Sequence, residues 1–336
     1  MKMKRYLPIA GIALILFGLT RAGRPESSPD DLPLWCRVYF TPRDPVADYL
    51  TALVGAARGK VYAAFYSIAL PEVAEAFVRA KKRGVDVRVV MDDREAIDPA
   101  VRVLRKKGLL AVDSSPADFM HDKFMVIDGI LSWTGSYNPT PTGSLYDDNN
   151  VVVIASRELA RLYEEEFLEM WNGKYGKSSP GPTRHPGREV AGVAVECRFS
   201  PEDDCASRLI ALIREARVSV RFAVFAFTLA PVAEELVRKH AEGVEVRGVF
   251  EKGQDSPYCC FRLLEDCGVE VRWDQNLYYL HHKFFVIDGR TVITGSFNPS
   301  RHAQIANDEN LLVIRHPGVA KRFLQEFERL WERKWE

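Results

Sequence analysis

The sequence predicts an α/β protein made of two similar sandwich domains that pack against each other as an intramolecular pseudo-dimer. Three observations support this prediction: a motif that occurs twice, strands that alternate with helices around each copy, and a Gly-, Ser- and Pro-rich stretch between the copies. The first motif, HDKFMVIDG, begins at His121, and the second, HHKFFVIDG, begins 160 residues later at His281. A motif that recurs together with its flanks indicates two copies of one structural unit.

The repeat extends well beyond the motif. GSYNP at 135–139 corresponds to GSFNP at 295–299, and EFLEMW, which ends at Trp171, corresponds to EFERLW, which ends at Trp331. Upstream of the motif the offset is 159 instead of 160, so one inserted residue separates the two registers.

Both copies are predicted to contain the same elements in the same order. Apolar periods of about two or 3.6 residues distinguish strands from helices, and glycines end several of the helices. The expected elements, first copy before second, are a strand at 37–40 and 195–199, a helix at 46–57 and 204–216, a strand at 61–67 and 218–227, a helix ending at Gly84 and Gly243, a strand at 85–91 and 244–250, a helix ending at Gly108 and Gly268, the motif strand, a strand ending at Gly-Ser, a loop, a strand at 151–154 and 311–314, and a last helix.

These elements predict one domain at residues 34–172, a linker at 173–192 and a second domain at 193–336. Residues 1–23 differ from the rest, because Lys2, Lys4 and Arg5 precede an uncharged apolar run. This layout is typical of an export signal.

The apolar run covers residues 7–19, and these 13 residues would form a helix of only about 20 Å, against roughly 30 Å of membrane hydrocarbon. We therefore expect residues 1–23 to be either a cleaved signal peptide or a short retained anchor, with a buried cytosolic helix as the remaining alternative. The leading basic residues would stay inside, so we expect an extracytoplasmic protein, secreted or anchored to the membrane.

Charge and cysteine content restrict the function classes. The 46 basic and 46 acidic side chains balance, but residues 1–23 contain four basic residues and no acid, so the remainder carries 42 against 46, a net charge of −4. Nothing global attracts a polyanion, and a nucleic-acid groove would have to be locally basic. The six cysteines include no C-x-x-C pair, which argues against structural zinc and leaves disulfides and buried thiols as alternatives.

Within the motif, a histidine and a lysine are two residues apart. Side chains at i and i+2 of a strand share a face, so His121 and Lys123 point the same way, as do His281 and Lys283. If the copies meet through these faces, one pocket receives two imidazoles and two ammonium groups, which suits an anionic phosphate. A metal site is disfavoured because the lysines repel a cation.

A single histidine on a strand is usually an ordinary core or surface residue. Here the same polar string recurs with identical spacing in both halves, whereas a neighbouring core position has changed from Met125 to Phe285. This contrast favours a functional role for the polar positions.

The doubled string H-x-K-x4-D-x6-G-S-x-x-N resembles the signature of the phospholipase D superfamily, and the resemblance covers nearly all of residues 36–335. The FTP and FSP openings at 40–42 and 199–201, with NDENLLVI near the C-terminus, resemble its compact nuclease-like branch. The resemblance implies a phosphodiesterase that works through a covalent phosphohistidine and needs no metal or other cofactor.

For the individual residues, the resemblance implies nucleophilic catalysis with general acid assistance. One neutral imidazole would attack phosphorus while the other, protonated, donates to the leaving oxygen. The lysines would hold the non-bridging oxygens together with a set of hydroxyl and amide side chains, namely Ser136, Asn138, Ser296 and Asn298. Asp128 and Asp288 point away from the lysines, so we assign them to structure.

The family pattern also places a carboxylate 28 residues after each histidine to orient the imidazole. Glu309 occupies this position for His281, but the position for His121 is Asn149. Asp148, beside it, would point away unless a bulge turned it. We therefore expect Glu309 to pair with His281, which would make His281 the nucleophile and His121 the general acid.

The resemblance implies a phosphodiester substrate, and three interpretations remain. Headgroup hydrolysis of a phospholipid is favoured by the export signal and by aromatic loops at 119–120 and 278–279 that suit contact with a membrane surface. An endonuclease acting on DNA or RNA is the alternative, with basic runs at 81–83 and 105–107, although each lies at a helix end where such charge is common. An inactive phosphate-binding scaffold is disfavoured because both motifs are complete. No obligate protein partner is implied.

Overall fold

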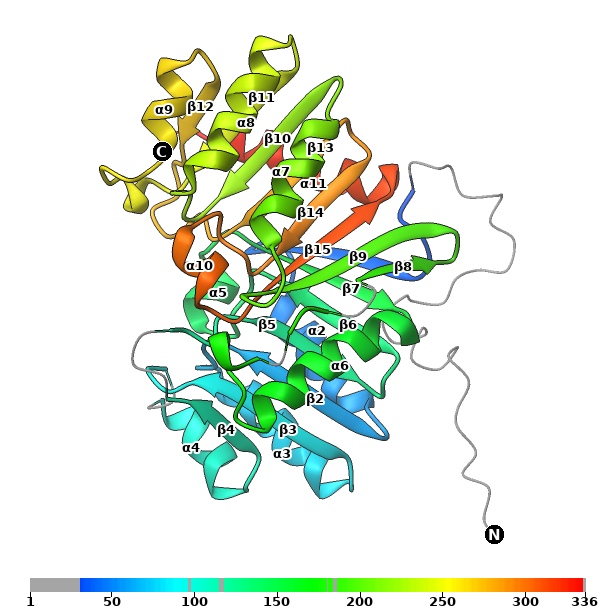
Figure 1. The fold of residues 1–336 in the computed structure, drawn as a ribbon. Helices are drawn as coiled ribbons and strands as arrows, with labels where there is room; N and C mark the ends of the chain where they lie inside the picture. The colour runs from blue at the N-terminus through cyan, green and yellow to red at the C-terminus, as the bar shows by residue number, and fades with distance from the viewer. Residues whose placement is uncertain (1–30, 96–97, 115–117, 180, 184–185, 335–336) are drawn as a thin grey trace.

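The computed structural model describes residues 31–95, 98–114, 118–179, 181–183 and 186–334. The segment predicted to be a signal peptide or anchor lies outside these residues. None of the helices within them is both long and apolar enough to cross a membrane. Two sheets of similar topology stack against each other, with the first half of the chain below the second in Figure 1.

The first half forms a seven-stranded mixed sheet in the order β1-β7-β6-β5-β2-β3-β4. Strands β2, β3 and β4 are parallel, because helices carry the chain back between them, and the other neighbours are antiparallel. Its elements are β1 (Cys36–Thr41), α2 (Val46–Ala56), β2 (Lys60–Phe65), α3 (Pro71–Lys82), β3 (Asp86–Asp92), α4 (Pro99–Lys106), β4 (Leu110–Asp113), β5 (Lys123–Ile127), β6 (Leu131–Gly135), α5 (Pro141–Leu145), β7 (Asn149–Ala155) and α6 (Arg157–Trp171).

The second half repeats this strand order and adds one edge strand, which gives β12-β11-β10-β13-β14-β15-β9-β8. The predicted α/β class with two similar domains is thus confirmed. Its elements, with the short helix that precedes them, are η1 (Gly176–Ser178), β8 (Gly187–Val190), β9 (Val193–Ser200), α7 (Cys205–Glu215), β10 (Ser219–Val224), α8 (Ala230–Ala241), β11 (Glu245–Phe250), η2 (Lys252–Gln254), α9 (Phe261–Asp266), β12 (Glu270–Trp273), β13 (Lys283–Ile287), β14 (Thr291–Gly295), α10 (Arg301–Ile305), β15 (Glu309–Arg315) and α11 (Pro317–Glu332).

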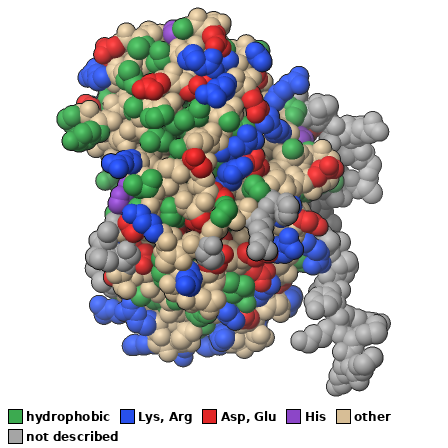
Figure 2. Space-filling view, in the orientation of Figure 1, with side chains coloured by type: hydrophobic (Ala, Val, Ile, Leu, Met, Phe, Trp, Pro, Cys, Tyr) green, Lys and Arg blue, Asp and Glu red, His purple; other side chains and the backbone are tan. Residues whose placement is uncertain are grey.

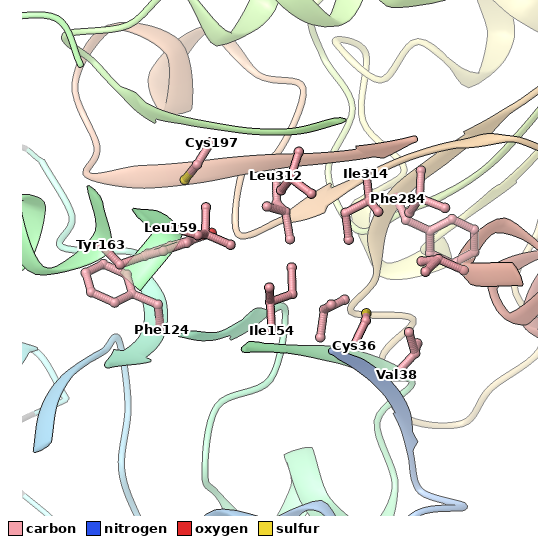
Figure 3. Close-up of a cluster of buried hydrophobic side chains, with 14 of the residues drawn as sticks. Cys36, Val38, Phe124, Ile154, Leu159, Tyr163, Cys197, Phe284, Leu312 and Ile314 are labelled. Carbon is pink, nitrogen blue, oxygen red and sulfur yellow. The ribbon is translucent and has the colours of Figure 1, made fainter. Parts of the chain in front are cut away.

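Three apolar clusters hold these layers together. One joins the first sheet to α2, α3 and α4, and one joins the second sheet to α7, α8 and α9. The third lies between the two sheets, contains α6 and α11, and brings Phe124 and Ile154 of the first half close to Leu312 and Ile314 of the second (Figure 3). Because alternate residues of a strand face opposite ways, β7 places Val153 in the outer cluster and Ile154 in the shared one.

Glycine is required where each Gly-Ser turn meets the neighbouring strand. Gly135 and Gly295 have φ values of 152° and 133°. A Cβ atom at Gly135 would lie 2.1 Å from the carbonyl oxygen of Asn150, and one at Gly295 would lie 2.2 Å from that of Asn310. These close approaches fix where the following serines sit.

The structure adds elements that the sequence did not predict. These are the short strands β4 and β12, the one-turn helices α5 and α10, and β8, which lies within the stretch predicted to be a linker and pairs with β9. All six cysteines lie in the described residues and are free thiols, five of them buried and Cys267 exposed.

Candidate active site

The two motifs begin where the halves of the chain are joined by backbone hydrogen bonds. The backbone N–H of His121 donates to the carbonyl oxygen of Asp308 (3.0 Å), and that of His281 donates to the carbonyl oxygen of Asp148 (2.9 Å). Each contact belongs to a short parallel bridge, Met120 with Asp308 and Leu280 with Asp148. Each motif therefore starts against the other half, at the residue directly before β15 or β7.

Two buried asparagines add side-chain bonds across the same interface. Asn150 donates from Nδ2 to Oγ1 of Thr294 (2.7 Å), and Thr134 donates from Oγ1 to Oδ1 of Asn310 (2.7 Å). Because these buried amides and hydroxyls find hydrogen-bond partners in the opposite half, they favour one register of the two halves.

The imidazoles also reach across to the other half. Nδ1 of His121 lies 2.8 Å from Oε2 of Glu309, which is fully buried. Nδ1 of His281 lies 2.9 Å from Oδ1 of Asn149 and 3.0 Å from the carbonyl oxygen of Ser136. The expected pairing of Glu309 with His281 is therefore wrong, because each histidine contacts the opposite half's strand rather than the strand 28 residues further along its own.

The two lysines are buried, and each contacts the backbone of the histidine in its own motif. Nζ of Lys123 donates to the carbonyl oxygen of His121 (2.6 Å), and Nζ of Lys283 donates to that of His281 (2.7 Å). Burial lowers the pKa of Lys123 to about 8 and holds the pKa of Lys283 well below its usual range. Burial, followed by the charges of both lysines, holds the pKa of each histidine well below 6.5. Because the charge of each lysine lowers the pKa of both imidazoles, the four groups lie close to one another.

An aromatic ring flanks each histidine and lysine pair. Tyr66 lies 5.3 Å from the His121 ring, and Phe225 lies 4.9 Å from the His281 ring. The ammonium groups of the lysines lie 5.4 Å and 5.0 Å from the same two rings. Tyr66 and Phe225 were not among the predicted site residues. They occupy the same position in the two copies, directly after β2 and β10, and the shared aromatic character of this position was the available signal. Such rings exclude water and stabilise a nearby cation.

The predicted oxygen-binding side chains have different surroundings. Both serines are fully buried. Oγ of Ser136 accepts from the backbone N–H of Asn150 (3.1 Å), and Oγ of Ser296 accepts from that of Asn310 (2.9 Å). Oδ1 of Asn138 is buried and has no partner among the described residues. The serines therefore position the first residues of β7 and β15, whereas this asparagine retains a free acceptor.

The motif aspartates bind backbone at the rim of each sheet. Asp128 accepts from the backbone N–H groups of Arg58, Gly59 and Lys60, and Asp288 from those of residues 217–219. Both aspartates have positive φ values, 54° and 51°. Each aspartate thus binds the backbone at the start of β2 or β10.

Asp148 does not replace the carboxylate that is missing at position 149. It forms ion pairs with Arg329 (2.5 Å) and Arg333 (2.6 Å) of the C-terminal segment. These arginines hold its pKa below the usual value despite burial. Only one of the two imidazoles, His121, therefore faces a carboxylate.

Taken together, the geometry defines a site of two imidazoles and two ammonium groups, contributed equally by two copies of one fold and suited to a phosphate group. A family model described as "Cardiolipin synthase, PLD-like domain" matches residues 50–171 and, a second time, residues 209–331. The chain therefore belongs to the phospholipase D-like family, and the resemblance found in the sequence is confirmed.

Characterised relatives match parts of the chain. The mitochondrial cardiolipin hydrolase of Canis lupus familiaris is 36% identical over 154 residues, which are 44% of this chain and 59% of the relative. The Xenopus tropicalis protein of the same name is 37% identical over 141 residues, 40% of this chain and 65% of the relative. This chain thus spans less than two thirds of the length of either relative.

Among solved structures, the phosphatidylserine synthase of Haemophilus influenzae superimposes with a TM-score of 0.65 at 12% identity, and covers 88% of this chain and 86% of its own. The polyphosphate kinase of Porphyromonas gingivalis gives a TM-score of 0.68 at 15% identity, over 92% of this chain and 50% of its own. At these identities the likeness concerns the fold, and it includes both halves.

Proposed function

We propose that this protein is a phosphodiesterase that hydrolyses the headgroup ester of phospholipids through a covalent phosphohistidine. The observation that carries the proposal is the convergence of His121, Lys123, His281 and Lys283 at the interface of the two halves. Two cardiolipin hydrolases match 44% and 40% of this chain, and their names support a lipid substrate.

We assign His121 as the nucleophile and His281 as the general acid, the reverse of the expectation from spacing. When Nε2 of His121 bonds to phosphorus, its imidazole becomes a cation, and Glu309 at Nδ1 stabilises that charge. A bound phosphate offsets the charges of the two lysines and so favours protonation of His281. Protonated His281 faces the neutral oxygens of Asn149 and Ser136, which stabilise its charge less than a carboxylate does and leave it a stronger acid.

The steps then balance as follows. Nε2 of His121 forms the P–N bond while the bond from phosphorus to the headgroup oxygen breaks, and His281 gives its proton to that oxygen. A water molecule next attacks phosphorus and yields a proton to His281, and the P–N bond breaks. The pair formed by Lys123 and Lys283 would hold the non-bridging oxygens throughout, an electrostatic contribution that is usually the largest in such sites.

The surroundings of the site favour a lipid surface. Leu277 is 86% exposed, and Tyr278 and Tyr279 are about half exposed, immediately before His281. Tyr146 of the other half stacks on Tyr278 with ring centroids 4.3 Å apart. Exposed aromatic and aliphatic side chains that cluster beside a pocket are typical of a membrane contact.

The basic runs considered for nucleic acid lie elsewhere. Those at 81–83 and 105–107 are at the C-terminal ends of α3 and α4, at the bottom of the molecule in Figure 1. In Figure 2, Lys and Arg side chains lie along the lower edge and also over the upper half, where hydrophobic side chains are exposed beside them. We also propose an extracytoplasmic location, secreted or anchored by residues 1–23, which would bring the site to a membrane.

The test is to incubate the full chain, with EDTA present, with phosphatidylcholine or cardiolipin vesicles, with single- and double-stranded DNA and with RNA. We expect headgroup release from the lipid and loss of this activity in His121→Asn and His281→Asn, with His240→Asn of α8 as the matched control. Cleavage of nucleic acid alone would indicate an endonuclease. Binding of phosphate without any cleavage would indicate a scaffold.

A further inference from the structure

A buried network in the second half of the chain is balanced by the protein's own cations. Glu326 of α11 is fully buried and forms ion pairs with His282 (3.2 Å), Arg329 (2.5 Å) and Arg43 from the loop after β1. These partners hold the pKa of Glu326 at about 2 despite its burial. The carboxylate is therefore charged, and it is fully compensated.

The equivalent network in the first half has lost every one of these cations. Glu166 of α6 corresponds to Glu326 at the offset of 160, and FTPRD at 40–44 corresponds to FSPED at 199–203. Each cationic partner has become an acid: His282 corresponds to Asp122, Arg329 to Glu169, and Arg43 to Glu202. A carboxylate surrounded by three cations in one copy is surrounded by three carboxylates in the other.

The acidic side chains converge. Glu166, Glu169 and Glu202 each place a carboxylate oxygen within 4.8 Å of the others. Glu166 is only 4% exposed and its Oε1 has no partner among the described residues, and the same holds for the buried Oε2 of Glu202. In the part of the chain that the structure describes, no Lys, Arg or His side chain forms an ion pair with any of the three.

Two further buried carboxylates that act on this cluster also have an unpaired oxygen each. Asp122 and Asp308 are buried, and each has one oxygen without a partner among the described residues. Both carboxylates act electrostatically on Glu166. Buried charges without compensation cost several kcal/mol each, so a site of this kind calls for a cation that the chain itself does not supply.

We propose that a divalent cation binds between Glu166, Glu169 and Glu202 and takes the place of the three cationic side chains of the second half. The ligands are all carboxylate oxygens, without histidine or cysteine, which favours Ca²⁺ or Mg²⁺ over zinc. The site joins α6 of the first half to the loop after β9 of the second. The cation stabilises the interface of the two halves, and it takes no part in the phosphodiester chemistry.

The inference does not depend on the proposed function, because its test measures ion binding and stability. The full chain is unfolded thermally in EDTA and in Ca²⁺, Mg²⁺ or Mn²⁺, and the ion retained after gel filtration is determined by elemental analysis. We expect one ion per chain. At a free ion concentration about 100 times Kd, the ratio of folded to unfolded protein rises about 100-fold, which should raise Tm by a few degrees.

The second half supplies the matched variant. Glu169→Arg with Glu202→Arg gives Glu166 two of the three cationic partners that Glu326 has, so this protein should lose the ion effect and should unfold at a higher temperature than the unchanged chain in EDTA. Glu165→Gln, an exposed acid on the same helix, should keep the full effect. Glu169→Gln alone alters the half-buried rim of the site and should weaken ion binding at least tenfold without requiring the core to repack.

Two results would overturn the proposal. An ion effect that persists in the double arginine variant would place the ion elsewhere. A Tm that no ion raises would also overturn the proposal. If Tm then rises as pH falls below about 7, protons neutralise the cluster, because burial raises the pKa of Glu202 to about 7.

Discussion

Replacing Glu309 by glutamine tests whether the carboxylate serves the nucleophile. The change preserves the size of the side chain and an oxygen that can accept from Nδ1 of His121, now 2.8 Å from Oε2. It removes the negative charge, and it also replaces Oε1, which accepts from Nδ2 of Asn307 (3.3 Å), by an amide donor. Neutral Asn149 already occupies the corresponding position beside His281, so the chain contains its own reference for an uncharged partner.

The magnitude follows from the separation of the charges. In the proposed first step phosphorus bonds to His121 and a full positive charge forms on its ring. This charge favours the ionised form of the neighbouring Glu309, although burial raises the pKa of that carboxyl to about 7. Two unit charges about 4 Å apart interact by ~4 kcal/mol at an effective dielectric constant of about 20. Because each 1.36 kcal/mol corresponds to a factor of ten in rate, Glu309→Gln should lower kcat/KM by about 10²–10³.

The assay uses bis(4-nitrophenyl) phosphate, a soluble phosphodiester, so that membrane binding does not enter the result. Asn149→Asp is the control: it places a carboxylate beside His281, raises the pKa of the acid and should change kcat/KM by less than about tenfold. Acid quenching followed by mass spectrometry should find the phosphoryl group on His121. A loss of less than tenfold in Glu309→Gln, or phosphate trapped on His281, would refute the assignment.

Three further outcomes are expected. Because burial lowers the pKa of Lys123 to about 8 and only its protonated form attracts phosphate, kcat/KM should fall as pH rises past about 8, and a flat profile from pH 7 to 9.5 would contradict this. Glu326→Gln should cost about 3–5 kcal/mol of stability, measured by denaturant unfolding, whereas Glu75→Gln in an exposed pair should cost less than about 1 kcal/mol. Leu277→Ser with Tyr278→Ser should lower vesicle hydrolysis at least fivefold relative to the soluble substrate, and equal losses on both substrates would argue against a membrane contact.

The repeated architecture could be predicted from the sequence because the strands and helices have a regular period of apolar residues and the two copies are separated by a nearly constant offset. Long strands such as β7, with apolar residues buried on both faces, have a strong signal. Strands β4 and β12 have only four residues each and are partly exposed, so they carry almost no period. Helices α5 and α10 are single turns, which begin after the capping residues Thr140 and Ser300 and are too short for a helical pattern.

The site residues could be predicted, but their pairing could not. Spacing along the chain associates Glu309 with His281, because both belong to the second copy. The structure associates it with His121, because the halves meet face to face and each motif begins against the other half. The interface between the halves determines which copy supplies the partner of each histidine. The spacing of residues within one copy carries no information about that interface.

This crossed arrangement makes a single carboxylate sufficient to distinguish the two histidines. During the first step the nucleophile gains positive charge while the general acid loses it, so catalysis is aided by a negative neighbour at the first and a neutral neighbour at the second. Glu309 beside His121 and Asn149 beside His281 meet both conditions at once. Asp148, the remaining acid near His281, is neutralised by Arg329 and Arg333. Two identical copies would leave the histidines equivalent, whereas one acid-to-amide difference between the copies would give each a separate role in the proposed mechanism.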